Sequence, residues 1–518
     1  MKGMHRGGGD SGRNVGKEHG MMTDHDDLPT HSCVSAGHVQ SKSQPRPQSQ
    51  PQPAQSPILH SRSHPTSRTL VRRVVAALVI MTLAGSTVLL GCLSAYAWYR
   101  RALADCVEWG TTYRLIDEHV AALTDQADAL VARDAAESRP DNSEARETQR
   151  LRTVAAGASK QRRQADMAVH AITDIQVSCA AKQSPVALHG HVEAFRDASN
   201  RLRPEIGCIH SAFEPVAARV FEHDPQVRAA VVNRIRAVMP GMRALYRDNT
   251  GLRDAGTRSG LHKALTQAAS AADNPGSTYR TLADAEHTLF AKADALIRAR
   301  NAERGIDCGR TACVALTFDD GPRAETSRRV VRTLRDKGDR ATFFAVGGAI
   351  NDATIPVLRD DTRYGMPVGS HTMSHTDLPA IMQAGTERQE FDDAAARISE
   401  ATGRPVNLLR PPHGAADEAS RRYLANHLGA GIALYDVDSY DWAAGASARS
   451  VQWKVTAQAR PGSIILMHDI QEHTAAALPH ILDALHAKGY RTVTIEELTG
   501  QYPRPGYVYY SRDNIIPW

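Results

Sequence analysis

The sequence predicts an α/β fold for residues 305–518, preceded by a single transmembrane helix and an α-helical region. Three observations along the 518 residues lead to this prediction. After about residue 310, short apolar runs alternate with helical patterns, which is typical of parallel βαβ units. Residues 74–99 form an uncharged run that is long enough to span a bilayer. Between these two parts, Ala-rich stretches carry apolar residues at helical spacing.

Charged residues are unevenly distributed along the chain. The formal net charge is +5, and residues 1–73 hold ten Lys and Arg against five Asp and Glu, so the rest of the chain is neutral overall. A folded part without a basic excess releases few counterions on binding, and we therefore expect no nucleic-acid partner. Seven cysteines in 518 residues also exclude a small disulfide-dense scaffold.

The N-terminal part is predicted to be a tail followed by a membrane anchor. Residues 1–73 are expected to be a disordered cytoplasmic tail, because Pro-, Gln- and Ser-rich composition buries too little apolar surface to offset ordering entropy. Residues 74–99 are the predicted transmembrane helix, with Tyr96, Trp98 and Tyr99 at the interface. Arginines flank both ends, with a small excess on the N-terminal side. We therefore expect a single-pass protein of a bacterial cytoplasmic membrane whose C-terminal part is extracytoplasmic, or periplasmic.

Two processing signals are alternatives to an uncleaved anchor. Ala95, Tyr96 and Ala97 resemble a small-residue cleavage site. Leu89 to Cys92 resembles the lipobox at which bacterial lipoproteins are cleaved and lipidated. Both signals ordinarily follow a shorter N-terminal segment than this one. All three alternatives place the rest of the chain in the same compartment.

Residues 100–304 are predicted to form an extracytoplasmic α-helical region. Further amphipathic stretches follow a first apolar stripe, and prolines are expected to separate them. We expect the stripe to be core, while self-association through this region stays open. The stripe is Ile116, Val120, Leu123, Ala127 and Leu130; the later stretches are 167–177, 215–221, 227–239 and 282–297; the prolines are Pro204, Pro225, Pro240 and Pro275.

Five cysteines would lie outside the cytoplasm, where disulfides persist. Cys308 and Cys313 are spaced to close a small loop before the α/β part. Cys106, Cys179 and Cys208 remain, and the sequence does not pair them, so one is left over or reduced.

The α/β part is predicted from its apolar runs. Active groups in such folds lie at the carboxyl ends of parallel strands, and the polar residues discussed next follow those ends. The predicted strands are 313–318, 341–346, 366–370, 432–435, 463–467 and 491–494, with a helix over 328–337.

Two of these strand ends carry a candidate metal site. Asp319 and Asp320 follow the first strand, where the sequence Asp-Gly-Pro alone would indicate only a turn. His371 and His375 follow the third, and their spacing of four predicts both imidazoles on one face of a helical turn. Two histidines and the Asp320 carboxylate would leave coordination positions open for water and substrate, the catalytic pattern. The motif is not HExxH, because Thr372 follows His371.

Three more segments follow along the chain. Arg410 is a cation on a stiff Pro-Pro turn. Asp441 and Trp442 follow the strand 432–435. His468 ends the strand 463–467, and Asp441 is a candidate partner that would raise its basicity.

The five segments, in this order, resemble the motifs of polysaccharide deacetylases of the NodB-homology type, carbohydrate esterase family four. The resemblance covers about residues 310–500. It implies a distorted (β/α) barrel as the catalytic domain, over residues 305–518, and an acetylated polysaccharide as substrate. It also implies a divalent metal, most often zinc, with cobalt, nickel or manganese as alternatives.

The resemblance also implies roles for the residues at the reaction centre. Asp319 is similar to the catalytic base. Asp320, His371 and His375 are similar to the metal ligands. His468 resembles the general acid that protonates the leaving amine.

The remaining motif residues resemble groups that position the base and the substrate. Arg410 would hold the base carboxylate, and Asp441 would tune the catalytic histidine. Trp442 and Leu466 resemble the walls of the acetyl pocket. His413 departs from the family pattern, which often has tyrosine there. The family uses the backbone N–H at this position for the oxyanion, so the chemistry should survive while the shape of the substrate subsite differs.

The expected function is therefore metal-dependent hydrolysis of N-acetyl groups on an amino-sugar polysaccharide outside the cytoplasm, either peptidoglycan or an exported polysaccharide. The bond cleaved would be a carbon–nitrogen bond other than a peptide bond. One alternative is an O-acetyl polysaccharide esterase of the acetyl-xylan type, because the same constellation serves both reactions. The other is a non-catalytic glycan-binding or scaffold protein of the membrane, against which the intact base, ligands and acid argue.

Overall fold

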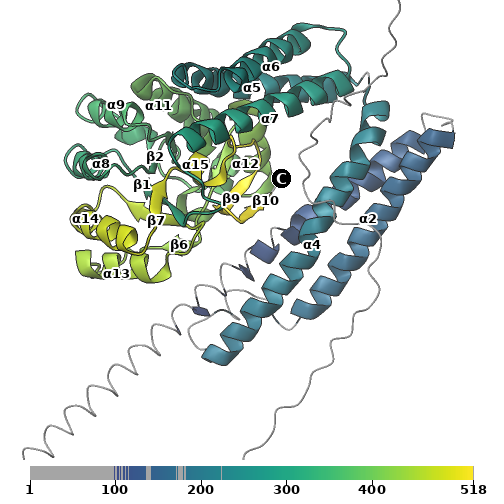
Figure 1. The fold of residues 1–518 in the computed structure, drawn as a ribbon. Coiled ribbons are helices and arrows are strands. Elements are labelled where there is room, and N and C mark those ends of the chain that lie inside the picture. The colour runs from purple at the N-terminus through teal and green to yellow at the C-terminus, as the bar shows by residue number, and fades with distance from the viewer. Residues whose placement is uncertain are drawn as a thin grey trace, which may run out of the picture. The chain divides into compact units, whose positions relative to one another are not determined.

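The fold is described from a computed structural model (Figure 1). The described residues are 116–135, 142–170, 183–222 and 224–516, with scattered positions between 99 and 114 and at 172 and 179. The predicted tail lies outside them, as does the predicted transmembrane helix except Tyr99. Within the described part of the chain, no helix is both long and apolar enough to cross a membrane. The membrane anchor stays a prediction.

Helices precede the sheet in two groups, and each group packs around an apolar core that also includes residues of the C-terminal part. The first group shares a core that buries the predicted stripe from Ile116 to Leu130, so the prediction that this stripe is core is confirmed. A disulfide joins Cys106 to Cys179 in this group. The first group comprises residues 116–135, α2 (Asn142–Val169) and α4 (Pro185–Val220); the second comprises α5 (Pro225–Asp248), α6 (Ala255–Asp273) and α7 (Tyr279–Glu303).

The prediction that prolines separate the helices is wrong for two of them. Pro204 lies inside α4 and Pro240 lies inside α5. A proline inside a helix costs about 3 kcal/mol, and burial of the long apolar faces of these helices offsets that cost. Pro225 is the first residue of α5, a position at which proline loses no hydrogen bond.

The C-terminal part is built on a curled, mostly parallel sheet. The strand order is β10-β9-β5-β4-β3-β2-β1-β7-β6, and β8 pairs with the beginning of β1. The strands are β1 (Cys313–Asp319), β2 (Thr342–Ala345), β3 (Val368–Ser370), β4 (Leu408–Leu409), β5 (Gly431–Ala433), β6 (Val437–Asp438), β7 (Ile464–His468), β8 (Arg491–Val493), β9 (Val508–Ser511) and β10 (Asn514–Ile516).

All six predicted strands are present, with ends that shift by one or two residues. β4 and β6 were not predicted, because they are two residues long and too short to show a pattern. The antiparallel hairpin of β9 and β10 was not predicted either. The predicted barrel is present as a curled sheet. Its described end strands, β6 and β10, do not pair with each other, and a single bridge from Ser463 to Ser511 spans the curl.

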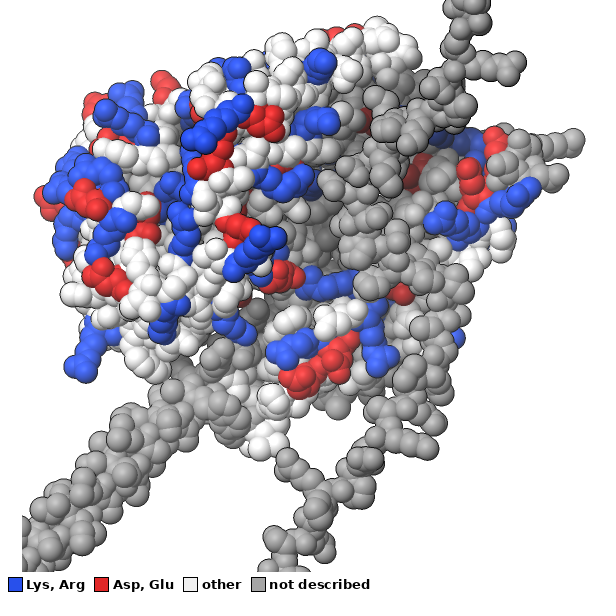
Figure 2. Space-filling view, in the orientation of Figure 1, with Lys and Arg blue, Asp and Glu red and all other residues white. Residues whose placement is uncertain are grey.

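Helices cover the outside of the curled sheet (Figure 1). A core of aliphatic side chains lies between them and the strands, and a second cluster fills the inside of the curl. On the face in Figure 2, Lys and Arg are interspersed with Asp and Glu over the described surface. The helices are α8 (Thr326–Lys337), α9 (Ile355–Arg363), α10 (Leu378–Ala384), α11 (Ala394–Thr402), α12 (Glu418–Tyr423), α13 (Ala448–Gln458), α14 (Glu472–Ala487) and α15 (Ile495–Thr499).

The helices α5 to α7 pack directly on the sheet part of the chain. Arg504 pairs with Asp294 of α7 at 2.8 Å, and Asn301 Nδ2 donates to the carbonyl of Glu497 at 3.0 Å. Tyr502 is buried in the core of these helices. Contacts therefore cross the predicted domain boundary at residue 304.

Gly241 of α5 shows how close this packing is, and replacing it tests the packing. A Cβ at this position would overlap the hydroxyl of Tyr502. We expect Gly241→Ala to destabilise the protein by about 1–3 kcal/mol through overpacking, which exceeds the gain of about 1 kcal/mol in helix propensity. Thermal melting measures the change. The control is Gly207→Ala in α4, where nothing lies within 4 Å and no loss is expected; equal melting of the two variants would contradict the packing.

Candidate active site and metal centre

The strand ends bring the predicted site residues together at one edge of the sheet. Asp319 ends β1 and His468 ends β7, and the two residues are partners in the parallel ladder. His371 and Arg410 directly follow β3 and β4, which are also parallel neighbours. Parallel strands present their carboxyl ends at the same edge, and this explains why residues up to 150 positions apart share one site.

One carboxylate and two imidazoles form a candidate metal centre. The Oδ1 atom of Asp320 lies 3.4 Å from Nε2 of His371 and 3.3 Å from Nε2 of His375. Ligand atoms of all three residues lie within 4.8 Å of one another. This Oδ1 atom is buried and has no hydrogen-bond partner in the described structure. A divalent ion would supply the missing partner, and the donor set of one carboxylate and two histidines suits zinc.

The charges at this centre favour an ionised carboxylate. Burial by itself raises the pKa of Asp320, but His371, His375 and His468 hold it well below its ordinary value. In turn, the Asp320 carboxylate raises the pKa of His375. Asp320 is therefore available as an anionic ligand at neutral pH.

The predicted helical turn between the two histidines is wrong. Residues 371–377 form an irregular loop, in which Thr372 and His375 have φ values of 63° and 61°. Glu390 holds this loop, because its Oε2 accepts from the backbone N–H of Met373 at 3.1 Å and of Ser374 at 3.0 Å. Backbone in the left-handed region persists where surrounding contacts determine it. The loop, rather than helical spacing, brings the two imidazoles together.

Arg410 is fully buried and holds Asp319. Its Nη1 atom donates to Oδ1 of Asp319 at 2.8 Å and to the hydroxyl of Thr317 at 2.6 Å. Its Nε and Nη2 atoms donate to the carbonyls of Ala433 at 3.1 Å and Leu434 at 3.0 Å. The rigid guanidinium fork thus fixes the orientation of the carboxylate.

His371 is oriented by the backbone of the same segment. Its Nδ1 lies 2.7 Å from the carbonyl oxygen of Arg410, an acceptor, so Nδ1 carries the proton. Nε2 is then unprotonated in the neutral ring and faces the carboxylates of Asp319 and Asp320. Such an outer hydrogen bond is the usual way in which a ligand histidine is fixed.

Asp441 and His468 form a second buried pair. The Oδ1 atom of Asp441 lies 2.6 Å from Nδ1 of His468, and its Oδ2 accepts from the hydroxyl of Thr474 at 2.6 Å. Burial lowers the pKa of His468, but the hydrogen bond and the charge of Asp441 outweigh burial and raise that pKa to about 9. The Nε2 atom of His468 lies 3.9 Å from Oδ2 of Asp320. A protonated imidazole therefore faces the candidate metal centre.

The three predicted substrate-binding residues differ in their exposure. Leu466 lies on β7 and is buried. Trp442 is 56% exposed, and its indole N–H donates to Oδ2 of Asp438 at 3.2 Å. His413 is exposed, and its ring meets that of His375 edge to face with centroids 4.9 Å apart. Trp442 and His413 are thus accessible to a substrate, whereas Leu466 is buried within the sheet.

Several residues that hold the site residues in place were not predicted from the sequence. Thr317 precedes Asp319 by two positions in β1, so strand periodicity could have found it on the same face. Glu390 and Thr474 belong to other elements, and no spacing relates them to the groups that they hold. Asp377 binds Nδ1 of His413 at 2.7 Å, which the sequence does not indicate either.

Comparison with known proteins assigns a family to this arrangement. Residues 307–431 match the family model described as polysaccharide deacetylase. Over 192 residues the chain is 33% identical to a chitooligosaccharide deacetylase of Sinorhizobium fredii, covering 34% of this chain and 87% of that protein. The chain belongs to the polysaccharide deacetylase family. The candidate site residues from Asp319 to His413 lie within the matched segment. Asp441, Trp442, Leu466 and His468 lie beyond it.

Two further proteins are similar to part of this chain. Peptidoglycan-N-acetylglucosamine deacetylase PgdA of Listeria monocytogenes is 35% identical over 199 residues, covering 38% of this chain and 41% of that protein. The chain thus spans less than half the length of this relative. A solved structure, "T48 deacetylase with substrate", is 35% identical, with coverage of 39% of this chain and 99% of that one and a TM-score of 0.37.

Proposed function

We propose that the chain is a metal-dependent hydrolase that removes N-acetyl groups from an amino-sugar polysaccharide. The observation that carries this proposal is the convergence of three units at one edge of the sheet. These are the Arg410–Asp319 pair, the ligand set centred on Asp320, and the Asp441–His468 pair. The names of the Listeria and Sinorhizobium relatives support an amino-sugar polymer as the substrate.

The ligand set defines which residues would hold the metal. Asp320, His371 and His375 would bind it, most often as zinc, with cobalt, nickel or manganese as alternatives. When bound, a divalent ion supplies a Lewis acid that polarises an amide carbonyl and lowers the pKa of water. Asp319 lies beside this set, held by Arg410, and takes the proton of the attacking water.

The leaving amine needs a proton, and His468 is placed to give it. With a pKa of about 9, its imidazole is protonated at neutral pH. Asp441 holds Nδ1, so the proton on Nε2 faces the site. Cleavage of the carbon–nitrogen bond then releases acetate and an amine. Trp442, Leu466 and His413 would contact the sugar and its acetyl group.

We also propose that this activity is extracytoplasmic, on a bacterial cytoplasmic membrane, with residues 74–99 as the anchor. The disulfides Cys106–Cys179 and Cys308–Cys313 support an oxidising compartment, because disulfides rarely persist in the cytoplasm. The Cys308–Cys313 disulfide closes the small loop expected from the sequence. Labelling spheroplasts with a reagent that does not cross the cytoplasmic membrane tests this placement, and a chain labelled only after lysis of the spheroplasts would contradict it.

The test of the activity uses the full chain in mild detergent, because α5 to α7 pack on the catalytic part. The substrates are peptidoglycan, chitooligosaccharides and acetyl-xylan, and the products are acetate together with a new amine or a new hydroxyl. Amine formation on a sugar polymer is expected. Hydroxyl formation alone would favour the O-acetyl esterase, and no acetate from any substrate, with metal bound, would overturn the proposal.

Removing the metal should abolish the activity. Loss of the metal can also be measured directly, without an activity assay. Chelation is expected to stop acetate release, and zinc is expected to restore it. His371→Ala should weaken zinc binding by more than about 100-fold, the upper end of what loss of a supporting residue costs. Zinc content after dialysis measures this change. The control is His480→Ala, at an exposed position of α14, which should retain the wild-type zinc content; equal zinc in both variants would refute the ligand set.

A further inference from the structure

A cavity lies at the opposite edge of the sheet from the candidate active site. Its volume is about 440 Å³. Met366, Pro367 and Val368 line it where the chain enters β3, and Asn407 lines it just before β4. The residues of the candidate active site follow the carboxyl ends of the same strands. The cavity therefore lies at their amino ends, where α5 and α7 also contribute to its walls.

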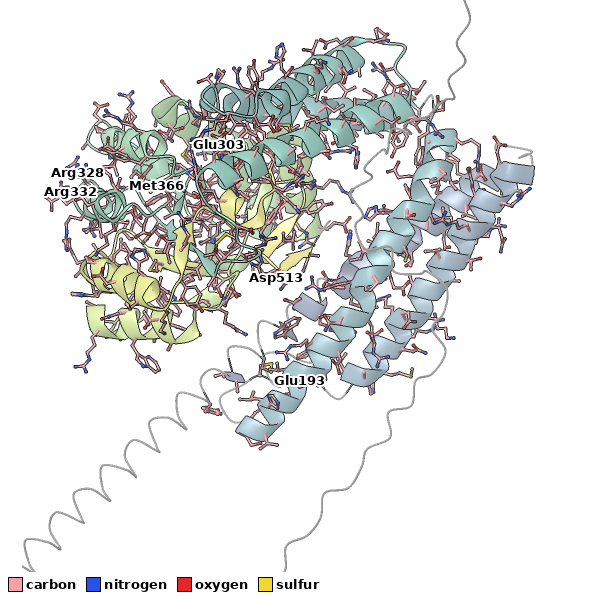
Figure 3. The ribbon with its side chains drawn as sticks, viewed as in Figure 1. Glu193, Glu303, Arg328, Arg332, Met366 and Asp513 are labelled. Atoms are coloured by element: carbon pink, nitrogen blue, oxygen red, sulfur yellow. A yellow bond between two sulfur atoms is a disulfide. The ribbon has the colours of Figure 1, made fainter. Side chains whose placement is uncertain are left out.

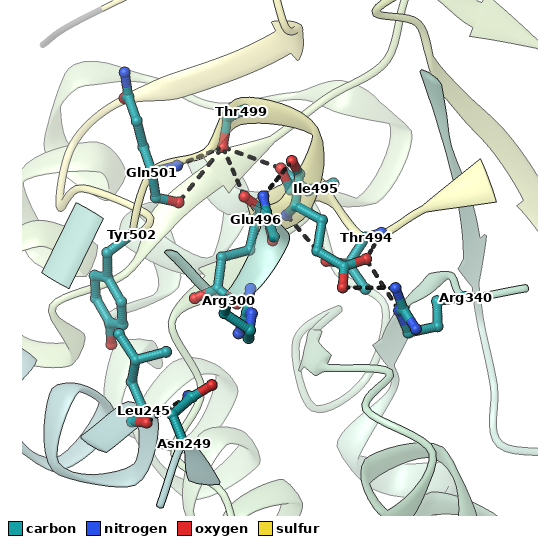
Figure 4. Close-up of polar contacts among 12 residues, drawn as sticks. Leu245, Asn249, Arg300, Arg340, Thr494, Ile495, Glu496, Thr499, Gln501 and Tyr502 are labelled. Atoms are coloured by element: carbon teal, nitrogen blue, oxygen red, sulfur yellow. Dashed lines mark hydrogen bonds and ion pairs between the residues drawn. The ribbon is translucent and has the colours of Figure 1, made fainter. Parts of the chain in front are cut away.

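The walls of this cavity differ in character. Ala244 and Leu245 of α5, together with Met366 and Pro367, are apolar lining residues. Tyr502, Asn249 and Glu496 also line the cavity, and Figure 4 shows them around Arg300. Four arginines make a cationic side: Arg300, Arg304, Arg363 and Arg404.

Positive charge exceeds negative charge in this lining by two. Asp248 and Glu496 are the acidic lining residues, and they pair with Arg404 at 2.6 Å and Arg300 at 3.1 Å. Arg304 pairs with Glu497 at 2.8 Å, but Arg340 shares that carboxylate at 3.0 Å. Including Glu497 and Arg340 in the count adds one negative and one positive charge, so the excess of two positive charges is unchanged.

Two of the arginines retain donors that the chain does not use. Arg363 is exposed and makes no ion pair with any residue that the structure describes. The side chain of Arg300 is only 12% exposed, and its Nε atom is buried with no hydrogen-bond partner in the described structure. A buried donor without an acceptor is costly, so an acceptor supplied by a ligand would stabilise this wall.

We propose that this cavity binds a small molecule with an apolar body and a terminal oxyanion, either a phosphate monoester or a carboxylate. Guanidinium groups recognise such oxyanions through paired, charge-assisted hydrogen bonds. The apolar lining residues Leu245 and Met366 accommodate the body. The volume lies within the range of about 300–1,000 Å³ that is typical of small-molecule sites, so a bare inorganic ion would leave most of it unfilled.

Calorimetric titration of the full chain tests this site. The probes are phenyl phosphate and benzoate, which distinguish the two oxyanions, with inorganic phosphate and neutral phenol beside them. Saturable binding of at least one aromatic anion is expected, tighter than that of inorganic phosphate, with none for phenol. Arg363→Gln, an exposed position that does not endanger folding, should weaken binding about tenfold through loss of one charge-assisted hydrogen bond.

The matched control is Arg332→Gln. Arg332 is exposed on α8, at the outer edge of the molecule in Figure 3, and does not line the cavity. Its replacement should leave binding unchanged. Equal weakening by both substitutions would show a general charge effect and overturn the proposal. Binding of phenol as tight as that of the anions, or no saturable binding of either anion, would overturn it as well.

Discussion

Replacing Asp319 with asparagine is expected to lower the rate of acetate release by about 100- to 10,000-fold, the usual contribution of a general base. The asparagine Oδ1 can still accept from Arg410, which lies 2.8 Å away, so the fold should be retained. What is lost is the group that takes the proton of the attacking water. The measurement is kcat for acetate release on an amino-sugar polymer, with zinc content as a check of the metal site.

The control for this substitution is Asp483→Asn on α14. Asp483 is exposed and pairs only with Lys337 among the described residues, on the outer surface. The Asp483→Asn variant should release acetate at the wild-type rate. An Asp319→Asn variant that keeps more than about a tenth of the wild-type activity would assign proton transfer to another group.

Arg410→Met is expected to destabilise the protein by about 3–5 kcal/mol, the cost of breaking a buried ion pair by removing one partner. Methionine fills much of the volume but leaves Asp319 without its cation. It also leaves the carbonyls of Ala433 and Leu434 without their donors. Activity should fall as well, since the carboxylate loses its fixed orientation. Denaturant unfolding and acetate release measure the two effects.

A second substitution separates the ion pair from the rest of this network. In an Asp319→Asn background the charge is absent, so Arg410→Met should cost less than it does in the wild type, as coupled neighbours do. Arg332→Met on the exposed face of α8 should change stability by less than about 0.5 kcal/mol. Equal costs of Arg410→Met in both backgrounds would show that the pair does not stabilise the fold.

Much of the candidate site could be predicted because parallel sheets follow a simple rule. Once β1, β3 and β7 are identified from their apolar runs, the residues that follow them must meet at one edge. Asp319, His371 and His468 meet there in the structure. The same rule could not predict the geometry within each loop. The path of residues 371–377 depends on hydrogen bonds from this loop to Glu390. No local sequence pattern predicts these bonds.

The helical region also combines features that local sequence predicts with features that depend on tertiary packing. The stripe from Ile116 to Leu130 is local, and its burial follows from helical periodicity. The prediction for two prolines is wrong because packing of the helices offsets the cost of an internal proline. Pro204 and Pro240 lie within helices whose apolar faces are buried over many turns.

The sequence by itself determined the order of the elements, the kinds of side chain at each strand end and the family of the chain. Each of these is encoded in short segments through periodicity, spacing and residue type. The tertiary structure alone decided the hydrogen bonds of Arg410 to Thr317, Ala433 and Leu434, the loop of the two histidines, and the packing of Tyr502 against Gly241. It also decided the arginine-lined cavity. These features depend on contacts between distant segments, and such contacts exist only once the chain has folded.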